Sequence, residues 1–198
     1  MFCHVQMCPS IFANHKGFDG VHILSRILTM NFLLKHVREE GGAYGTGSAH
    51  QSGANYFSSY DDPNVLRTID QFVQGCKWIR EEQYSAKDID EARLSLFGEI
   101  DAPSEPQTLG FSDIFTGKTT EQRQKQRDLL LGMSASDLHE VAKEAYLCQA
   151  SELSSCVFGN KESAKEVANN STWIVEELKV DYDVYIKQEA HLEKFRNL

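Results

Sequence analysis

The sequence predicts an α+β domain in which helices pack on one face of a sheet that contains antiparallel strands. Two extended runs, 43–50 and 54–60, are separated by Gln51-Ser52-Gly53, a pattern typical of a β-hairpin. Helical apolar periodicity dominates the segments between the predicted strands. The order of strand, long helix, two strands, several helices and strand favours this class. With 198 residues, 41% of them hydrophobic, the chain can bury a core of its own.

The N-terminal elements are a strand and a long helix. Residues 2–8 are apolar-rich and are followed by Pro9, so we expect a strand there. Over 18–37, apolar residues recur every three or four positions, which predicts a helix with one buried stripe. That stripe comprises Val21, Leu24, Ile27, Leu28 and Phe32. Gly41-Gly42 is expected to end this helix.

The later helices begin at recognisable caps. Asp62-Pro63 predicts a helix with an aspartate N-cap and a proline at its first position. Capping-box patterns predict three more helix starts, at Ser85-x-x-Asp88, Thr119-x-x-Gln122 and Ser134-x-x-Asp137. Beyond the break at 102–106 and these helices, we expect a last strand at 151–158, a short helix at 161–169 and a terminal segment at 171–178.

The charge and composition exclude several classes of function. The chain has 20 Lys+Arg against 29 Asp+Glu, a net charge of −9, which argues against binding to nucleic acid or to an anionic membrane. The most apolar stretch, 23–34, is interrupted by polar residues and is too short to span a membrane. The N-terminus shows no targeting signal. Five scattered cysteines indicate thiols in a reducing compartment rather than a disulfide framework.

Near-matches to metal motifs do not predict a metal site in this chain. The run His36-Val37-Arg38-Glu39-Glu40 resembles H-x-x-E-H, but glutamate replaces the second histidine. His36 and Glu40 could bind a metal only with a third ligand from elsewhere, and the alternative is a solvated helix end. His139–Lys143 places a lysine at a ligand position of H-E-x-x-H. The cluster of Cys3-His4 with Cys8 lacks a second pair of ligands.

Three glycines, Gly42, Gly45 and Gly47, surround Tyr44. They do not form a phosphate-binding loop, because the third glycine of G-x-G-x-x-G is missing. On a strand, Gly45, Gly47 and Ala49 share one face, which has almost no side chains. Two interpretations remain open: a partner chain or peptide approaches this face, or the strand packs tightly against the preceding helix.

Arg38 and Tyr44 flank the two-glycine bend. Together they offer a fixed cation and a phenolic donor, which suit the binding of a peptide carbonyl and of the oxyanion it becomes. Neither residue can generate a nucleophile. The residues alone favour a structural interpretation, in which Arg38 complements the helix C-terminus and Tyr44 is an ordinary strand aromatic.

The run Val37–Gly45 (VREEGGAYG), followed by Tyr60–Asn64 (YDDPN), resembles the C-terminal domain of the presequence-protease branch of the pitrilysin (inverzincin) family of zinc metallopeptidases. Later segments match in the same order: Asp88–Phe97, Ile100–Pro103 and Ser171–Ile174. The similarity therefore predicts a family domain over 1–176, truncated at its N-terminal end, and a charged tail over 177–198.

The resemblance implies more than the residues do alone. Family members have four related α+β domains around a peptide-digesting chamber, with H-x-x-E-H in the first domain. The last domain contributes an arginine and a tyrosine that contact the substrate carbonyl at the zinc. By motif position these catalytic residues are Arg38 and Tyr44, with Gly42, Gly45 and Gly47 as the substrate-binding surface. The family usually has a third glycine where Thr46 stands.

The resemblance also implies the cofactor, the partners and the compartment. Zinc would be bound outside this chain, which would hold no metal and would be inactive alone. The partners would be peptide substrates, namely targeting peptides and other short unstructured peptides, and the N-terminal catalytic half of the enzyme. The compartment would be the mitochondrial matrix. Two alternatives remain: a non-catalytic peptide- or subunit-binding domain of the same fold, and a fragment that self-associates through exposed apolar surface.

Overall fold

The computed structural model describes residues 3–9, 18–51, 54–81, 84–103, 110, 114–115, 117, 119–147, 154–169 and 173–177. The chain divides into two compact units, 1–160 and 161–198. The domain boundary between 176 and 177 stays a prediction, because residues 178–198 lie outside the described residues.

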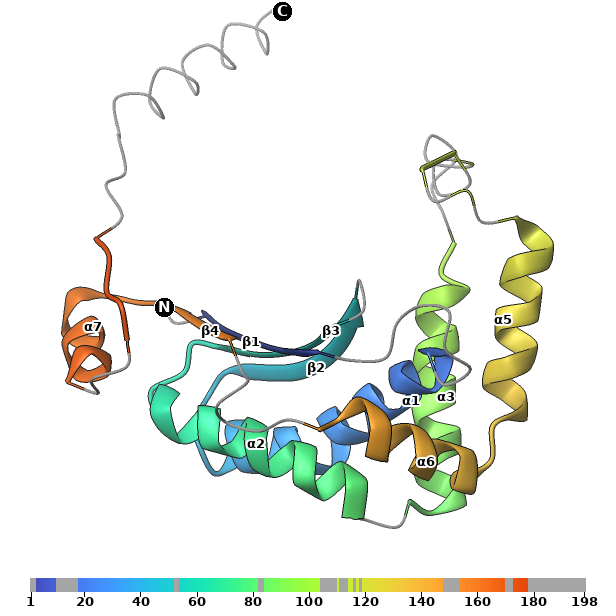
Figure 1. Cartoon of the computed structure of the whole chain (residues 1–198), viewed down its shortest axis with the longest axis horizontal. Helices are drawn as coiled ribbons and strands as arrows, with labels where there is room; N and C mark the ends of the chain where they lie inside the picture. The colour runs from blue at the N-terminus through green and yellow to red at the C-terminus, as the bar shows by residue number, and fades with distance from the viewer. Residues whose placement is uncertain are drawn as a thin grey trace, which may run out of the picture. The chain divides into compact units, whose positions relative to one another are not determined.

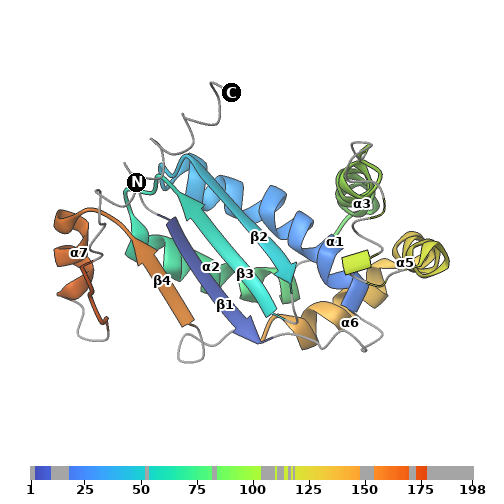
Figure 2. The same cartoon turned by 90° about the horizontal axis from the view of Figure 1, so that it is seen from above.

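The described strands of the larger unit form one antiparallel sheet, as predicted. They are β1 (Cys3–Pro9), β2 (Gly45–Gln51), β3 (Ala54–Tyr60) and β4 (Ser154–Phe158), in the spatial order β2-β3-β1-β4 (Figure 2). The antiparallel pairing of β2 with β3 confirms the expected hairpin, and residues 52 and 53 of its turn lie outside the described residues. The predicted residues 151–153 of the last strand lie outside the described part of the chain.

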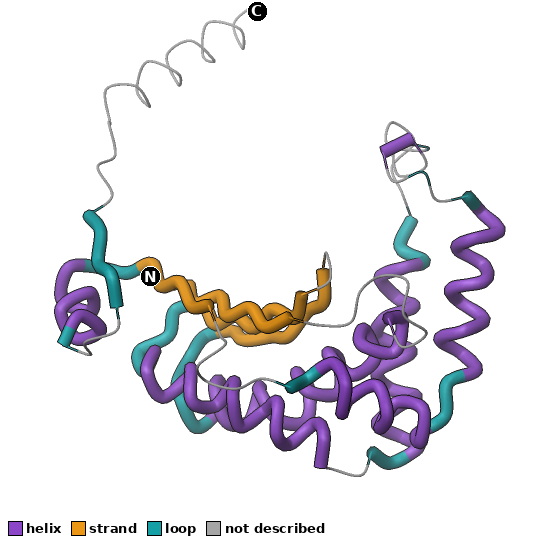
Figure 3. Tube along the Cα trace, in the orientation of Figure 1, coloured by secondary structure: helices purple, strands orange, loops and turns teal. Residues whose placement is uncertain are grey.

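Helices cover one face of this sheet, which confirms the predicted α+β class. The larger unit contains α1 (Phe18–Leu28), η1 (Thr29–Glu39), α2 (Val65–Glu81), α3 (Ala86–Ile100), α5 (Thr120–Gly132) and α6 (Ala135–Ala145). Of these, α1, η1 and α2 pack on the sheet, whereas α3 and α5 lie beside it and pack against α1. Figure 1 shows α1 and α2 beneath the sheet, and no described helix of this unit lies on the opposite face. The tube drawing makes the same two layers visible as orange strands above purple helices (Figure 3).

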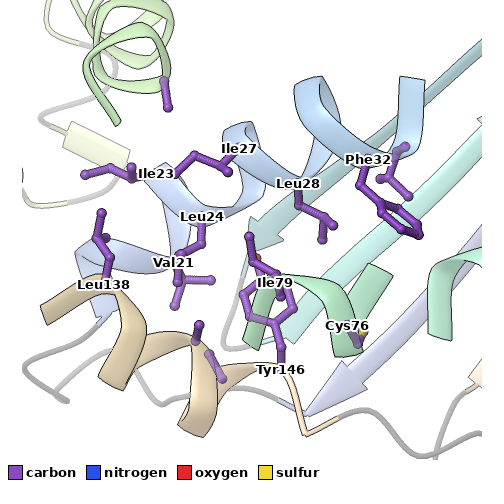
Figure 4. Close-up of a cluster of buried hydrophobic side chains, with 14 of the residues drawn as sticks. Val21, Ile23, Leu24, Ile27, Leu28, Phe32, Cys76, Ile79, Leu138 and Tyr146 are labelled. Carbon is purple, nitrogen blue, oxygen red and sulfur yellow. The ribbon is translucent and has the colours of Figure 1, made fainter. Parts of the chain in front are cut away.

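The core lies between the sheet and these helices. All five residues of the predicted apolar stripe are buried, which confirms the burial inferred from their spacing. Figure 4 shows Val21 and Leu24 of α1 facing Leu138 of α6 and Tyr146, which follows α6. The hydroxyl of Tyr146 lies 3.0 Å from Ser25 Oγ, so both buried polar groups are paired.

The helix expected over 18–37 changes type in the structure. Residues 18–28 are α-helical, but η1 is a π-helix with i→i+5 hydrogen bonding that continues to Glu39. The buried residues of η1 are Phe32, Leu33 and Val37. Thr29 at the junction donates its hydroxyl to Ser25 O and accepts the main-chain N–H of Ser48, in β2.

The helix starts follow local capping chemistry, with one correction. Reciprocal capping boxes begin α3 at Ser85, α5 at Thr119 and α6 at Ser134, as predicted. The prediction of Asp62 as N-cap is wrong, because α2 begins at Val65 and Asn64 O accepts the N–H of Thr68. Asp62 instead accepts the N–H of Asn64 in an Asx-type turn.

The smaller unit contains α7 (Lys161–Ala168), which confirms the helix expected at 161–169. Residues 173–177 follow without regular structure, and Lys161 Nζ pairs with Glu177 Oε1 at 2.8 Å. No helix in the described part of either unit is long and apolar enough to cross a membrane.

Candidate functional site

The candidate site is the bend that joins η1 to β2, residues 39–44. Main-chain hydrogen bonds close the helix end: Gly42 N–H donates to Arg38 O at 2.9 Å, and Ala43 N–H donates to Val37 O at 3.2 Å. Gly42 has φ +83°, a left-handed conformation that disfavours any residue with a side chain. The bend therefore ends the helix as predicted, and it gives Gly42 a conformational reason to be glycine.

Gly41 is required for a different reason. A Cβ atom at this position would lie 2.4 Å from the main-chain oxygen of Val37 and 3.1 Å from that of His36. The last helical carbonyls thus occupy the space that a side chain would need. Both glycines of the bend are explained by its backbone geometry.

The segment that follows β3 fastens the bend. Asn64 donates its side-chain Nδ2–H to Gly41 O at 2.7 Å. The carboxylate of Asp62, which is 1% exposed, accepts hydrogen bonds from Ser59 Oγ at 2.7 Å and from the Asn64 N–H at 2.8 Å. Tyr44 N–H donates to Tyr60 O at 3.0 Å, so the start of β2 is tied to the end of β3.

A charged cluster, His36, Glu40 and Arg67, lies on the solvent side of the bend. His36 Nδ1 is 2.9 Å from Glu40 Oε2, and this hydrogen bond holds the pKa of Glu40 below its ordinary value. Arg67 donates from Nη1 to the main-chain oxygen of Glu40 at 2.9 Å, and its Nη2 lies 3.7 Å from Glu40 Oε2. Arg67 therefore binds the main-chain carbonyl of Glu40 and also faces its carboxylate.

This cluster does not fit a metal ion. His36 and Glu40 would supply two ligands, but the carboxylate faces the Arg67 guanidinium and the described residues offer no third His, Cys, Asp or Glu to complete a site. Lysine and arginine side chains beside the carboxylate oppose a cation. We therefore derive no chemistry from a metal at this position.

Arg38 and Tyr44 emerge at the two ends of the bend, and both are exposed. The Tyr44 side chain is 72% exposed, and its ring meets that of Tyr60 edge to face, with centroids 6.1 Å apart. Among the described residues, the Arg38 side chain and the Tyr44 hydroxyl make no hydrogen bond or ion pair. A cation and a phenolic donor are thus exposed at the two ends of the bend.

The strand register places the glycines on the face of the sheet that carries no described helix. Gly45 pairs with Tyr60 and Gly47 with Ser58, whereas buried Phe57, which faces the helices, pairs with Ser48. Among the described residues, a Cβ at Gly45 would meet no atom within 4 Å, and a Cβ at Gly47 would meet only Thr29 Cγ2 at 4.0 Å. Tight packing against the described residues therefore does not explain Gly45.

Tyr44 precedes β2 rather than lying within it, so the alternation of side chains along the strand does not fix the direction of its ring. Its ring instead contacts Tyr60, on the face of Gly45. Thr46 stands where a third glycine is usual. Its hydroxyl donates to Ser58 O, in the neighbouring strand β3, at 2.9 Å.

Sequence reasoning missed Tyr60, Asn64 and Arg67 as parts of this site. The run Tyr60–Asn64 is part of the resemblance. A hairpin of the two predicted strands would bring this run beside the bend, and that pairing was the available signal. Arg67 has no local signal, because its contact with Glu40 depends on how α2 packs beside η1.

Comparison with known proteins decides the family. The model of the PreP C-terminal domain matches residues 2–154. The chain belongs to the PreP C-terminal domain family. Relatives named mitochondrial presequence protease are 33% identical in Xenopus laevis, over 81% of this chain, and 36% identical in Saccharomyces cerevisiae, over 83% of it. The chain spans 16% of the length of each of these two relatives.

Solved structures share the fold at low identity. An inactive peptidase domain from Bordetella parapertussis superposes with a TM-score of 0.63 at 16% identity, covering 79% of this chain and 91% of that one. The peptidase M16 inactive domain from Pseudomonas fluorescens gives 0.61 at 13% identity, covering 79% and 40%. The fold therefore occurs in domains that lack peptidase activity of their own.

Proposed function

We propose that this chain is the C-terminal part of a zinc metalloendopeptidase that degrades targeting peptides and other short unstructured peptides in the mitochondrial matrix. The observation that carries the proposal is the bend with exposed Arg38 and Tyr44 at its two ends, in a chain of this family. The relatives' name, mitochondrial presequence protease, supports the substrate class and the compartment.

In this proposal Arg38 and Tyr44 bind the carbonyl oxygen of the scissile peptide bond. The guanidinium and the hydroxyl both donate hydrogen bonds, and both bonds strengthen as negative charge develops on that oxygen. Because the gain is larger in the transition state than in the ground state, the pair accelerates the reaction rather than merely binding substrate. The bare face of Gly45 and Gly47, with Gly42 at the bend, lets the substrate backbone approach.

The chain would have no activity alone. Neither Arg38 nor Tyr44 can activate water, and the His36–Glu40 pair does not fit a metal ion. Zinc would supply the activation of water from a site in the N-terminal catalytic half, which this chain does not contain. Peptide substrates and that half of the enzyme are therefore the partners we propose.

The test uses a complete enzyme in which residues 2–176 replace the corresponding domain of the yeast relative. Cleavage of a fluorogenic peptide is measured at several substrate concentrations. We expect Arg38→Ala and Tyr44→Phe each to lower kcat by about 10²–10³-fold, the usual loss for one oxyanion donor. Gly45→Val is expected to raise KM instead, because it fills open space on the proposed substrate face.

Arg26→Ala is the matched control, since Arg26 pairs with Glu99 away from the bend. It should cleave at the parental rate. Parental kinetics for both Arg38→Ala and Tyr44→Phe would refute the proposed roles. Stable binding of the isolated chain to the separately produced N-terminal half, without restored cleavage, would favour the alternative of a non-catalytic binding domain.

A further inference from the structure

We propose that Asn64 and Arg67, at the start of α2, are positioning residues that hold the bend between Arg38 and Tyr44. The inference rests on the proposed function, because it concerns how those two side chains are presented to a substrate. It adds residues that touch neither the substrate nor the reacting atoms.

The first step concerns the end of η1. The carbonyls near the end of η1 accept main-chain N–H groups of the bend, but those just beyond its last residue need donors from elsewhere. Here two consecutive carbonyls of the bend receive side-chain donors: Arg67 Nη1 donates to Glu40 O at 2.9 Å, and Asn64 Nδ2 donates to Gly41 O at 2.7 Å. The bend is therefore held at two successive peptide units from α2.

The second step concerns what holds Asn64. Its main-chain N–H donates to the buried carboxylate of Asp62, which also accepts from Ser59 Oγ at the end of β3. Ser59 is 2% exposed and Asp62 is 1% exposed, so the anchor lies in the packed interior. The hydrogen bond from Asn64 to the bend is thus supported by buried residues at the end of the sheet rather than by a mobile surface side chain.

The third step concerns why such a grip is needed. The bend contains Gly41 and Gly42, and glycine has the largest backbone freedom of any residue. Arg38 lies before these glycines and Tyr44 after them, so freedom at the bend changes the separation of the two side chains. A misplacement of about 1 Å in a catalytic group can cost about 10²-fold in rate. Holding the Glu40 and Gly41 carbonyls limits that freedom.

The ion pair of Arg67 with Glu40 is a smaller part of the argument. Both side chains are 44% exposed, the separation is 3.7 Å, and solvent weakens such pairs. The charged groups around Glu40 are His36, Lys35 and Arg67, and all three lower its pKa. The hydrogen bond from Arg67 to the main-chain carbonyl of Glu40 carries the positioning role, because it acts directly on a peptide unit of the bend.

The experiment uses the same complete enzyme, with kcat, KM and the thermal midpoint measured for each variant. We expect Asn64→Ala to lower kcat by about 10–10²-fold with KM changed less than about threefold, because transition-state contacts are misplaced while binding persists. Arg67→Ala should act in the same direction, and Arg67→Lys should restore part of the rate. Asn31→Ala is the control: it removes the amide donor to Asp88 Oδ1 and should leave kcat unchanged.

A double-mutant cycle separates positioning from a general effect on folding. If Asn64 acts through Arg38 and Tyr44, adding Asn64→Ala to a variant that carries both Arg38→Ala and Tyr44→Phe lowers kcat less than about threefold further. Losses that multiply in the combined variant overturn this inference and leave the proposed function standing. Parental kcat for Asn64→Ala, beside a strong loss for Arg38→Ala, does the same.

A second measurement decides the case in which Arg38→Ala itself has no effect. The proposed function then fails, but the grip on the bend can still be tested in the isolated chain by amide hydrogen exchange. Asn64→Ala should speed exchange at Gly42 and Ala43 by at least about tenfold, with little change at amides of α3. Equal exchange rates at Gly42 and Ala43 in the parent and in Asn64→Ala would overturn the inference.

Discussion

Replacing Gly41 by alanine is the most direct test of the bend's geometry. The new Cβ would lie 2.4 Å from Val37 O, whereas side-chain Cβ contacts under 3.0 Å essentially never occur, so a backbone atom must move. Overpacking of this kind costs about 1–3 kcal/mol. Moving the Val37 carbonyl also weakens its hydrogen bond from Ala43 N–H, worth about 0.5–1.5 kcal/mol. We therefore expect Gly41→Ala to lower the free energy of unfolding by about 2–4 kcal/mol.

The assay is thermal and urea unfolding of the isolated chain, with Gly45→Ala as control. At roughly 2–4 °C per kcal/mol for a chain of this size, Gly41→Ala should lower Tm by about 5–15 °C. Gly45→Ala adds its methyl group to open space and should stay within about 0.5 kcal/mol of the parent. Equal stability of the two variants would refute the close contact at Gly41.

Two further predictions concern stability. Ser85→Ala should cost about 1 kcal/mol at pH 7 by removing the cap of α3. Hydrogen bonds from Ser85 lower the pKa of Asp88, so this stabilisation is complete above about pH 4 and is lost as pH falls through the lowered native pKa. Urea unfolding at pH 7 and pH 3 should show a smaller difference in unfolding free energy between the parent and Ser85→Ala at pH 3. The same difference at both pH values would contradict this. Phe57→Ala should cost about 3–5 kcal/mol in urea unfolding, because its ring is 1% exposed and stacks on Phe72 at 5.3 Å; a loss under about 1 kcal/mol would contradict the packing.

Local chemistry made much of the fold predictable. The capping boxes at Ser85, Thr119 and Ser134 involve residues three positions apart, so their hydrogen bonds need no information from distant parts of the chain. The apolar stripe of the first helix was predictable in the same way, because regular spacing indicates one buried face.

Features that depend on tertiary contacts were not predictable. Asp62 has the chemistry of an N-cap, but its carboxylate is engaged by Ser59 and Asn64, and the helix begins later. The change from α1 to η1 has no local sequence signal, because buried Leu33 and Val37 keep the four-residue interval of an ordinary α-helix.

The candidate site was predictable in its residues but not in its support. Arg38 and Tyr44 could be named from the bend and the resemblance, and the structure leaves both exposed. The side chains that hold the bend were not predictable, because Arg67 reaches Glu40 only through the packing of α2 beside η1. The catalytic roles themselves stay predictions until the variants are measured.

The hydroxyl of Thr29 affects whether the edge of the sheet at β2 can pair with a strand of another chain. β2 is one of the two edge strands of the described sheet, and its outward-facing amides could recruit a strand from a second molecule. The Ser48 amide, midway along that margin, is already occupied by Thr29 Oγ1. A foreign strand would have to give up a hydrogen bond there, so one threonine works against indefinite growth of the sheet.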